Sequence, residues 1–461
     1  MILERIHKIS NDKSQKMIFY GLIALMFLYP IPSFFLPDSE KGTAMQAILL
    51  IFAVFYFVFF IVTECINQRF SLLKNGLAEK CIVGLIIVGG VSMLTAYDKM
   101  TALYGTSNRG EGLFSLLAYY LIFVGTTMLQ RVEYRKKLLR LFLLFGVIVA
   151  ILGVVQYTGI YVMGERFPGY AYVPMRNPNF YGAFTVLFTG VSIGGFFSYK
   201  KESDVTHPFL WWNRVVWYVL VLLGYAGCIS AKSTLVYAGL IMLLLVYLFL
   251  ELATKRRKLL SFLLLVAGLL LMIHVFNVQK KGDVVAEIKT VENQIKAEGS
   301  LTGDSVGSGR MRIWKDSISF LSEYGLLGCG IDCLGHVWIE TLGYSYAGTY
   351  VDKAHNEYLN LWITEGFFAL VIYLVFLFSL FIPGLLLFFG KRGRDGGKEE
   401  EPARKQGKYD EISKIAFFAF FGYIAQAFFN ISVIQVAPYF WMICGLLYSR
   451  KRNMNEETMD C

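Results

Sequence analysis

His355 lies in the segment Asp352-Lys-Ala-His-Asn-Glu-Tyr-Leu-Asn-Leu-Trp-Ile-Thr-Glu-Gly366, just before a long apolar stretch. The imidazole of histidine exchanges a proton near neutral pH, and it needs no metal to do so. None of the five histidines lies in an HxxxH arrangement and no cysteine pair has CxxC spacing, so the sequence predicts no metal site. We expect His355 to move a proton in a reaction. A structural role is the alternative for a lone histidine.

Four cationic residues have positions that suit the binding of a phosphate or pyrophosphate group. Arg109, Arg176 and Lys232 lie close to the ends of apolar stretches, and Arg310 opens an amphipathic segment. Guanidinium and ammonium groups form charge-assisted hydrogen bonds with phosphate oxygens. Anchoring at a membrane interface is the alternative for each of these residues.

The segment Arg176-Asn-Pro-Asn179 has the composition of a helix start. Asn177 suits the N-cap position and Pro178 the first helical position, and Asn179 follows them. The free N–H groups at such a helix end attract anions. The segment therefore predicts an anion site, with a plain helix start as the alternative.

The composition identifies the environment in which these residues work. Of the 461 residues, 56% are hydrophobic and only 17% are charged, against roughly 45–50% and about 25% in soluble domains. A water-soluble globule has too little interior to bury that much apolar surface. The composition therefore excludes a soluble enzyme, a disordered chain and a fibrous protein, and it predicts a multi-pass membrane protein.

The apolar stretches predict an all-α fold with about twelve transmembrane helices and a small helical extracytoplasmic domain between spans 9 and 10. Each stretch has roughly 20 mostly apolar residues, the length that a spanning helix needs. The apolar runs are continuous rather than alternating, which favours helices over strands. The predicted spans are 17–36, 43–64, 78–97, 112–130, 138–158, 178–199, 210–229, 233–252, 259–277, 367–390, 412–429 and 432–449.

The distribution of cations predicts the orientation of the spans. With a cytoplasmic N-terminus, 30 of the 44 Lys and Arg residues fall in cytoplasmic segments and only six in short outer segments. The positive-inside rule therefore places both termini in the cytoplasm and the large loop outside a cytoplasmic membrane. Basic blocks at 131–137 and 255–258 suit contact with anionic membrane lipids, so the net charge of +10 requires no nucleic acid partner.

Four regions follow from this topology. Residues 1–277 hold spans 1–9, and 278–356 form the extracytoplasmic domain that carries catalytic residues. Residues 357–449 hold a re-entering helix and spans 10–12, with a cytoplasmic linker at 391–413, and 450–461 form a cytoplasmic tail. Within the outer domain, apolar spacing predicts helices at 283–298 and about 310–323. Cys329 and Cys333 in this domain either form a disulfide or stay reduced.

Several short motifs, in this order and topology, resemble the O-antigen ligase and O-antigen polymerase superfamily of multi-pass membrane glycosyltransferases. The run His-Asn-x-x-Leu followed by Glu-Gly is the most specific of them. The matching pieces are Gly105-Thr-Ser-Asn-Arg-Gly-Glu-Gly-Leu113, Arg176-Asn-Pro-Asn-Phe-Tyr-Gly-Ala183, Ser230-Ala-Lys-Ser-Thr234, Gly309-Arg-Met-Arg-Ile-Trp314, Gly325-Leu-Leu-Gly-Cys-Gly330, Ala354-His-Asn-Glu-Tyr-Leu359 with Glu365-Gly366, and Ala425-Gln-Ala-Phe-Phe-Asn430.

The resemblance implies an enzyme that transfers a glycan from undecaprenyl pyrophosphate to a hydroxyl of a glycan or lipid acceptor on the outer face. Transfer would proceed with inversion and without a metal or cofactor. His355 would be the general base, and Arg310 would bind the donor pyrophosphate. Lys232 takes the place of the usual family arginine, which keeps the charge but loses the bidentate fork.

The resemblance also implies supporting roles around these two residues. Further contacts to the donor anion would come from Arg109 and Arg176. Residues that shape the site would be Asn177, Pro178, Asn179, Asn356 and Glu365. Because Glu365 lies nearly three helical turns beyond His355, we expect it to line a channel or to support the structure rather than to contact the histidine.

Two other functions compete with the glycosyltransferase. A transporter or flippase of the same lipid-linked oligosaccharide would carry polar or cationic residues along the middle of its spans, and the predicted spans have few charges in their interiors. A structural or sensor protein would have no need for His355, Arg310 and the Asn-Pro-Asn segment on one face. The sequence leaves the sugar, the acceptor and the choice between ligase and polymerase open.

Overall fold

A computed structural model describes residues 2–36, 38–66, 76–129, 131–161, 167–199, 214–254, 259–279, 283–300, 302–307, 309–343, 351–389 and 401–448. Over these ranges every regular element is a helix, as the sequence predicts. The helices are α1 (Ile2–Leu28), α2 (Pro32–Phe35), α3 (Asp38–Ile66), α4 (Leu77–Ser92), α5 (Lys99–Tyr104), α6 (Leu113–Thr127), α7 (Val132–Tyr157), α8 (Pro178–Ser198), α9 (Arg214–Ser230), α10 (Thr234–Ala253), α11 (Leu259–Gln279), α12 (Asp283–Glu298), α13 (Arg310–Ser319), α14 (Leu321–Tyr324), α15 (Leu334–Leu342), α16 (Glu357–Glu365), α17 (Phe367–Leu386), α18 (Glu401–Ala427) and α19 (Ala437–Leu447).

Seven segments of the described chain are long and apolar enough to cross a membrane. They are Lys13–Phe35, Gly42–Phe59, Val132–Tyr157, Pro178–Ser198, Val236–Ala253, Leu259–Gln279 and Phe367–Leu386. Three further apolar helices, α6, α9 and α19, are shorter. Each of the twelve predicted stretches coincides with a helix, but several of these helices are shorter than expected, so the count of twelve spans stays a prediction.

Helix α8 forms the centre of the bundle, where it packs against α7, α9, α10 and α18. Two glycines allow its closest approach to α18. A Cβ atom on Gly190 would come within 2.5 Å of the Cα of Ala419, and one on Gly194 within 2.6 Å of the carbonyl oxygen of Ile415. The four-residue spacing puts both glycines on one face, so the two backbones touch directly, as in small-xxx-small helix pairs of membrane proteins.

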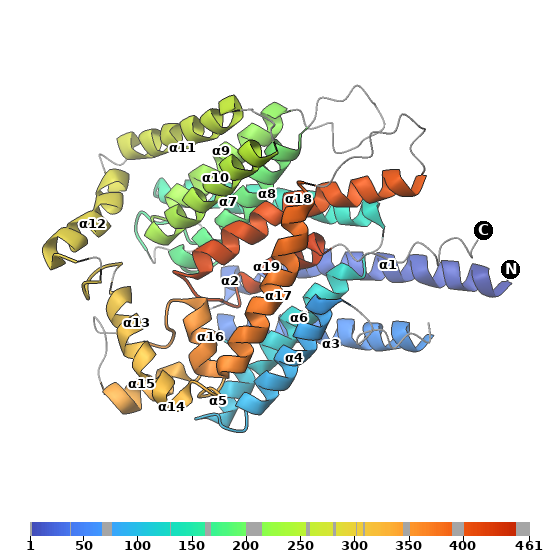
Figure 1. Cartoon of the computed structure of the whole chain (residues 1–461), viewed down its shortest axis with the longest axis horizontal. Helices are drawn as coiled ribbons and strands as arrows, with labels where there is room; N and C mark the ends of the chain where they lie inside the picture. Colours follow the sequence, from blue (N-terminus) through green and yellow to red (C-terminus); the bar gives the residue numbers. More distant parts are fainter. Residues whose placement is uncertain are drawn as a thin grey trace.

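The two ends of the bundle differ in structure. Helices α1 and α18 begin at one end, on the right of Figure 1, and the short helices α12 to α15 lie at the opposite end, on the left. The helix α12 has the bounds predicted for it, and α13 with α14 covers the second predicted helix, with a break at Phe320. The loop between spans 9 and 10 is therefore helical, as expected.

Part of the predicted linker is helical. Helix α18 begins at Glu401, twelve residues after the start of the expected linker at 391–413 had been passed by two-fifths, and its first turns are rich in Glu, Lys, Arg and Ala. These residues favour helix even without an apolar face. Linker residues 391–400, the basic block 255–258 and the predicted tail 450–461 lie outside the described residues.

The close contact of α8 with α18 makes a stability prediction. Gly194→Ala should destabilise the protein by about 1–3 kcal/mol, because the added methyl group overpacks a backbone-to-backbone contact. The matched control is Gly90→Ala in α4, where an added Cβ meets no atom within 4 Å. Thermal unfolding of the purified protein in detergent should show a lower Tm for Gly194→Ala only. Equal Tm values for the two variants would contradict the close packing.

Candidate active site

His355 lies in the loop that precedes α16, and its backbone is left-handed with φ of 50°. Asn356 ends this loop as the N-cap of α16, since its side chain accepts a hydrogen bond of 3.0 Å from the Leu359 N–H. A left-handed conformation costs a residue with a side chain of order 1–3 kcal/mol, and such residues cluster at functional sites. The loop thus turns the half-buried imidazole of His355 away from the helix that follows it.

Left-handed backbone is concentrated at the predicted site. Four residues other than glycine adopt positive φ in the described chain: Arg176, Lys232, Asp332 and His355. Three of these four are residues that the sequence singled out for chemistry. The fourth, Asp332, was not predicted, and it contacts the same loop as His355 through Lys353.

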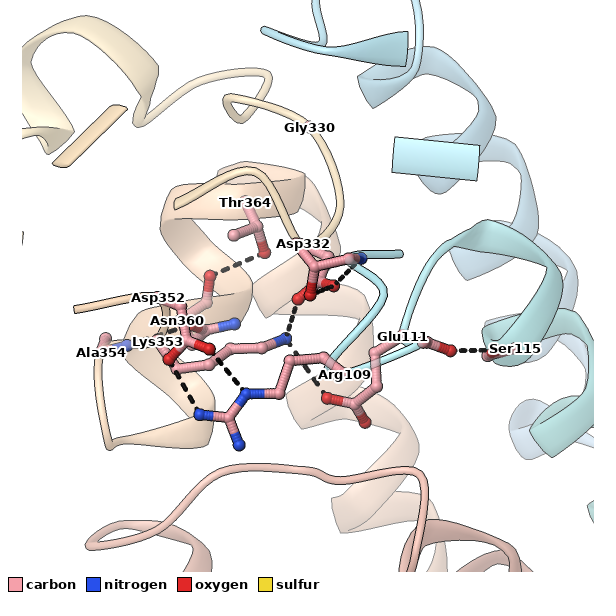
Figure 2. Close-up of polar contacts among 12 residues, drawn as sticks. Arg109, Glu111, Ser115, Gly330, Asp332, Asp352, Lys353, Ala354, Asn360 and Thr364 are labelled. Carbon is pink, nitrogen blue, oxygen red and sulfur yellow. Dashed lines mark hydrogen bonds and ion pairs between the residues drawn. The ribbon is translucent and has the colours of Figure 1, made fainter. Parts of the chain in front are cut away.

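Two ion pairs hold the loop of His355 in place, as Figure 2 shows. The Arg109 guanidinium donates two hydrogen bonds to the Asp352 carboxylate, at 2.7 Å from Nε and 2.9 Å from Nη2. The Lys353 ammonium lies 2.7 Å from Oδ1 of Asp332 and 3.3 Å from Oε2 of Glu111. The two residues next in sequence to Ala354 and His355 are thereby tied to loops more than 200 and about 20 residues away.

Burial gives these pairs unusual electrostatics. Burial alone would raise the pKa of Asp352, but the adjacent Arg109 outweighs it and holds that pKa below its ordinary value. Burial would likewise lower the pKa of Lys353, yet the carboxylates of Asp332 and Glu111 raise it. Burial raises the pKa of Glu111 to about 7, with Lys353 opposing the rise. Lys353 is thus a firmly charged cation inside the protein.

Arg310 is the first residue of α13, and it enters the site from the loop domain. Its Nη1 donates a hydrogen bond of 2.9 Å to the Gly307 carbonyl, while its buried Nε has no hydrogen-bond partner in the described chain. Burial lowers the pKa of Arg310 to about 10. Trp314, one turn later, stacks on Phe429 with ring centroids 6.1 Å apart and so docks α13 on the end of α18.

The surroundings of His355 keep its ring uncharged. Burial lowers the pKa of His355 to about 4, and the positive charges of Arg310 and Arg109 lower it further against the opposing charge of Asp352. At neutral pH the imidazole is therefore unprotonated and available to accept a proton. The same values show that Arg310 and Arg109 lie close enough to the imidazole for their charges to act on it.

The start of α8 has the predicted capping. Asn177 is the N-cap, its side chain accepts a hydrogen bond of 2.8 Å from the Asn179 N–H, and Pro178 occupies the first turn. The Arg109 guanidinium carbon lies 5.7 Å from the ring centroid of Phe180 in that turn. Arg109 therefore connects the helix start with the loop of His355.

Lys232 is joined to the same helix start. Its neighbour Ser233 donates a hydrogen bond of 2.7 Å to Oδ1 of Asn179. The Lys232 ammonium lies over two tyrosine rings, 4.9 Å from the centroid of Tyr170 and 5.9 Å from that of Tyr157. Arg176, one residue before the N-cap, is buried. Printed contacts thus link Lys232, through Asn179 and the first turn of α8, to Arg109 and the loop of His355.

A polar cavity of about 70 Å³ lies behind the His355 loop. Its lining includes Glu111, Asp332, Lys353, Glu357 and Glu365, and it is large enough to hold ordered water. The Oε2 atom of Glu365 is buried without a hydrogen-bond partner in the described chain. Glu365 thus lines a cavity, as expected, rather than contacting His355.

Sequence reasoning missed four residues that the structure adds: Glu111, Asp332, Asp352 and Lys353. A signal was present, because Asp352 and Lys353 carry opposite charges directly before Ala354-His355, and Arg109-Gly-Glu111 shows the matching pattern. Cys329 and Cys333 are both buried and both free, so they do not form the disulfide that the sequence left open. No group of three or more His, Cys, Asp or Glu in the described ranges has the geometry to hold a metal ion.

Comparison with known families gives one match, over residues 218–374, to the family model described as O-Antigen ligase. Residues 218–374 form an O-antigen ligase domain. The resemblance to the O-antigen ligase and polymerase superfamily is thus confirmed over this segment, which includes Lys232, Arg310 and His355. Arg109 and the start of α8 lie outside the ligase domain. No curated protein matches the chain.

The uncharged state of His355 is directly testable. Diethyl pyrocarbonate acylates only neutral imidazole, so peptide-resolved labelling of His355 should fall with a midpoint near pH 4 instead of the ordinary value of about 6.5. Arg310→Met should raise the midpoint, because a nearby positive charge is removed. Lys315→Met on the same helix, which breaks only an exposed pair with Asp304, should leave it unchanged. A wild-type midpoint near 6.5 would contradict the described environment.

Proposed function

We propose that the protein is an inverting glycosyltransferase that moves a glycan from undecaprenyl pyrophosphate to an acceptor hydroxyl at the outer face of the cytoplasmic membrane. The observation that carries this proposal is the convergence, beside an O-antigen ligase domain's His355, of Arg310 and Arg109. An uncharged imidazole next to fixed cations suits a reaction that removes a proton and releases an anion.

In the proposed step, a ring nitrogen of His355 accepts the proton of the acceptor hydroxyl. The hydroxyl oxygen attacks the anomeric carbon of the donor sugar and forms the new glycosidic bond. The bond from that carbon to the pyrophosphate oxygen breaks, and the leaving oxygen keeps the electron pair. Attack opposite to the leaving group inverts the anomeric configuration. The proton on His355 then passes to water.

The cations stabilise the negative charge that develops on the leaving pyrophosphate. Arg310 is the strongest candidate, because its Nε is buried and makes no other hydrogen bond in the described chain. Arg109 spends Nε and Nη2 on Asp352, which leaves Nη1 for an anion. Lys232 and Arg176 stand at the start of α8, where backbone N–H groups add to the attraction.

The proposed sidedness rests on the two ends of the bundle. The cation-rich start of α18 and the start of α1 lie at the end opposite to α12–α15 (Figure 1). The positive-inside rule favours a cytoplasmic location for the former. The termini are then cytoplasmic, and His355 lies on the outer face with the helical loop domain.

A transporter of lipid-linked oligosaccharide is the alternative function. It would carry polar or charged residues along the middle of its spans. The ion pairs of the site instead join loops before α6 and before α15 to the loop before α16. The central helix α8 is buried along its length and has no charged residue. These observations favour an enzyme at the bundle's end.

His355→Ala should abolish glycan transfer, since a positioned base contributes about 10²–10⁴-fold. The protein should still insert and accumulate at wild-type levels. The measurement is the amount of surface polysaccharide in a deletion strain complemented with each variant, normalised to membrane protein. His336→Ala, a histidine in the same loop domain, is the matched control and should retain product. Near-wild-type product from His355→Ala would remove it from the catalytic role.

Arg310→Ala should reduce product more than Arg310→Lys, because lysine keeps the positive charge while losing the guanidinium fork. The same complementation assay measures both. Equal, severe loss in both variants would indicate that donor binding needs the fork itself. Wild-type product from both would remove Arg310 from the site.

Deleting the gene and separating the surface glycans on a gel distinguishes the two activities within the superfamily. Loss of long chains while single repeats stay attached indicates a polymerase. Loss of all attachment indicates a ligase. Unchanged glycans would contradict both and would favour the alternative function.

A further inference from the structure

We infer that Lys353, Asp332 and Glu111 form a buried clamp that positions His355 for the reaction. The inference rests on the proposed function of His355 as the base. The three side chains belong to three separate loops: Glu111 precedes α6, Asp332 precedes α15, and Lys353 lies two residues before His355. None of them contacts the acceptor or donor in this scheme, so all three are positioning residues.

The burial of the clamp shows how strongly it is determined. The side chains of Lys353, Glu111 and Asp332 are 6%, 5% and 1% exposed. Removing one partner from a buried pair leaves the other charged and unsolvated, which is strongly unfavourable. The clamp therefore has one stable arrangement, with the ammonium between the two carboxylates.

Asp332 ties the clamp to a second loop. Its Oδ2 accepts hydrogen bonds from the Thr106 N–H at 2.7 Å and from the Thr106 hydroxyl at 3.0 Å, while Oδ1 faces Lys353. The backbone of Asp332 is itself left-handed, with φ of 60°. Two strained residues, Asp332 and His355, thus lie at either side of Lys353, and the ion pair between them supplies energy that sustains both conformations.

The loop after Lys353 is fixed from below as well. The Ala354 N–H donates a hydrogen bond of 3.1 Å to Oδ1 of Asn360, which lies one turn into α16 (Figure 2). With Lys353 clamped on one side and Asn356 capping α16 on the other, His355 has little freedom left. Its left-handed φ is the conformation that satisfies these contacts together.

The clamp is distinct from the exposed ion pair of the same domain. Lys315 and Asp304 lie 2.6 Å apart with side chains 55% and 54% exposed. Exposed pairs of this kind contribute at most about 1 kcal/mol. Lys315→Met is therefore a matched control for Lys353→Met: each removes one ammonium from one aspartate of the loop domain, and only the second acts on His355.

The test uses Asp332→Asn, Glu111→Gln, Lys353→Met and Lys353→Arg in the full chain. Asn tolerates the left-handed backbone, so Asp332→Asn removes charge without adding backbone strain. Two measurements are made on each variant: product in the complemented deletion strain per amount of folded protein, and peptide-resolved labelling of His355 by diethyl pyrocarbonate as a function of pH. The charged groups that act on His355, Arg310, Arg109 and Asp352, stay in place.

Asp332→Asn and Lys353→Met should lower product per folded protein by up to about 100-fold, since a displacement of about 1 Å can cost that much. Labelling of His355 should accelerate, and its midpoint should rise towards the ordinary value. Glu111→Gln should act in the same direction but less, because Lys353 keeps Asp332. Lys353→Arg should recover part of both readouts, and Lys315→Met should change neither.

Three outcomes decide between the ideas. Folded Asp332→Asn and Lys353→Met with wild-type product and wild-type labelling would overturn the clamp. A loss of product that follows only the amount of folded protein, with unchanged labelling, would also overturn it, because the role would be structural. If His355→Ala keeps its product while Asp332→Asn still alters labelling, the clamp stands and the proposed catalytic function fails.

Discussion

The rest of the site depends on one buried cation, the ammonium of Lys353. Its removal from water is costly, and the two carboxylates at 2.7 and 3.3 Å offset that cost. Those carboxylates come from loops that precede different helices, so satisfying a single charge brings three distant segments together. The bidentate pair of Arg109 with Asp352 repeats the same principle one residue earlier. Electrostatics at the loop ends, rather than apolar packing, sets the position of His355.

The apolar bundle has a complementary task, which is to hold those loops at one end. Helix α8 contributes through its contact with α18, and its capped start carries Asn179 to Ser233 beside Lys232. Trp314 packs the first helix of the loop domain on Phe429 after α18. Apolar contacts thus bring the cationic residues to the same end, and hydrogen bonds fix their orientation there.

Much of this architecture could be predicted from the sequence because its signals are local. Continuous apolar runs predict the helices, and the spacing at 283–298 gives α12 its bounds. Asn177 and Pro178 predict the start of α8. The clamp could not be predicted in the same way, since Arg109 and Asp352 are 243 residues apart and each looks like an ordinary charge near a helix end. The start of α18 was missed because helix propensity alone, without an apolar face, favours it there.

The direct backbone contact between α8 and α18 has a consequence for how the protein is made. The two helices are separated by some 200 residues of chain, so the glycine face of α8 remains unpartnered in the membrane until synthesis has passed residue 427. The ligase domain at 218–374 is complete in sequence before that point, yet it lacks Arg109, Glu111 and the start of α8. Its residues therefore form an active constellation only as a late product of assembly, which delays chemistry on lipid-linked substrates until the whole chain is inserted.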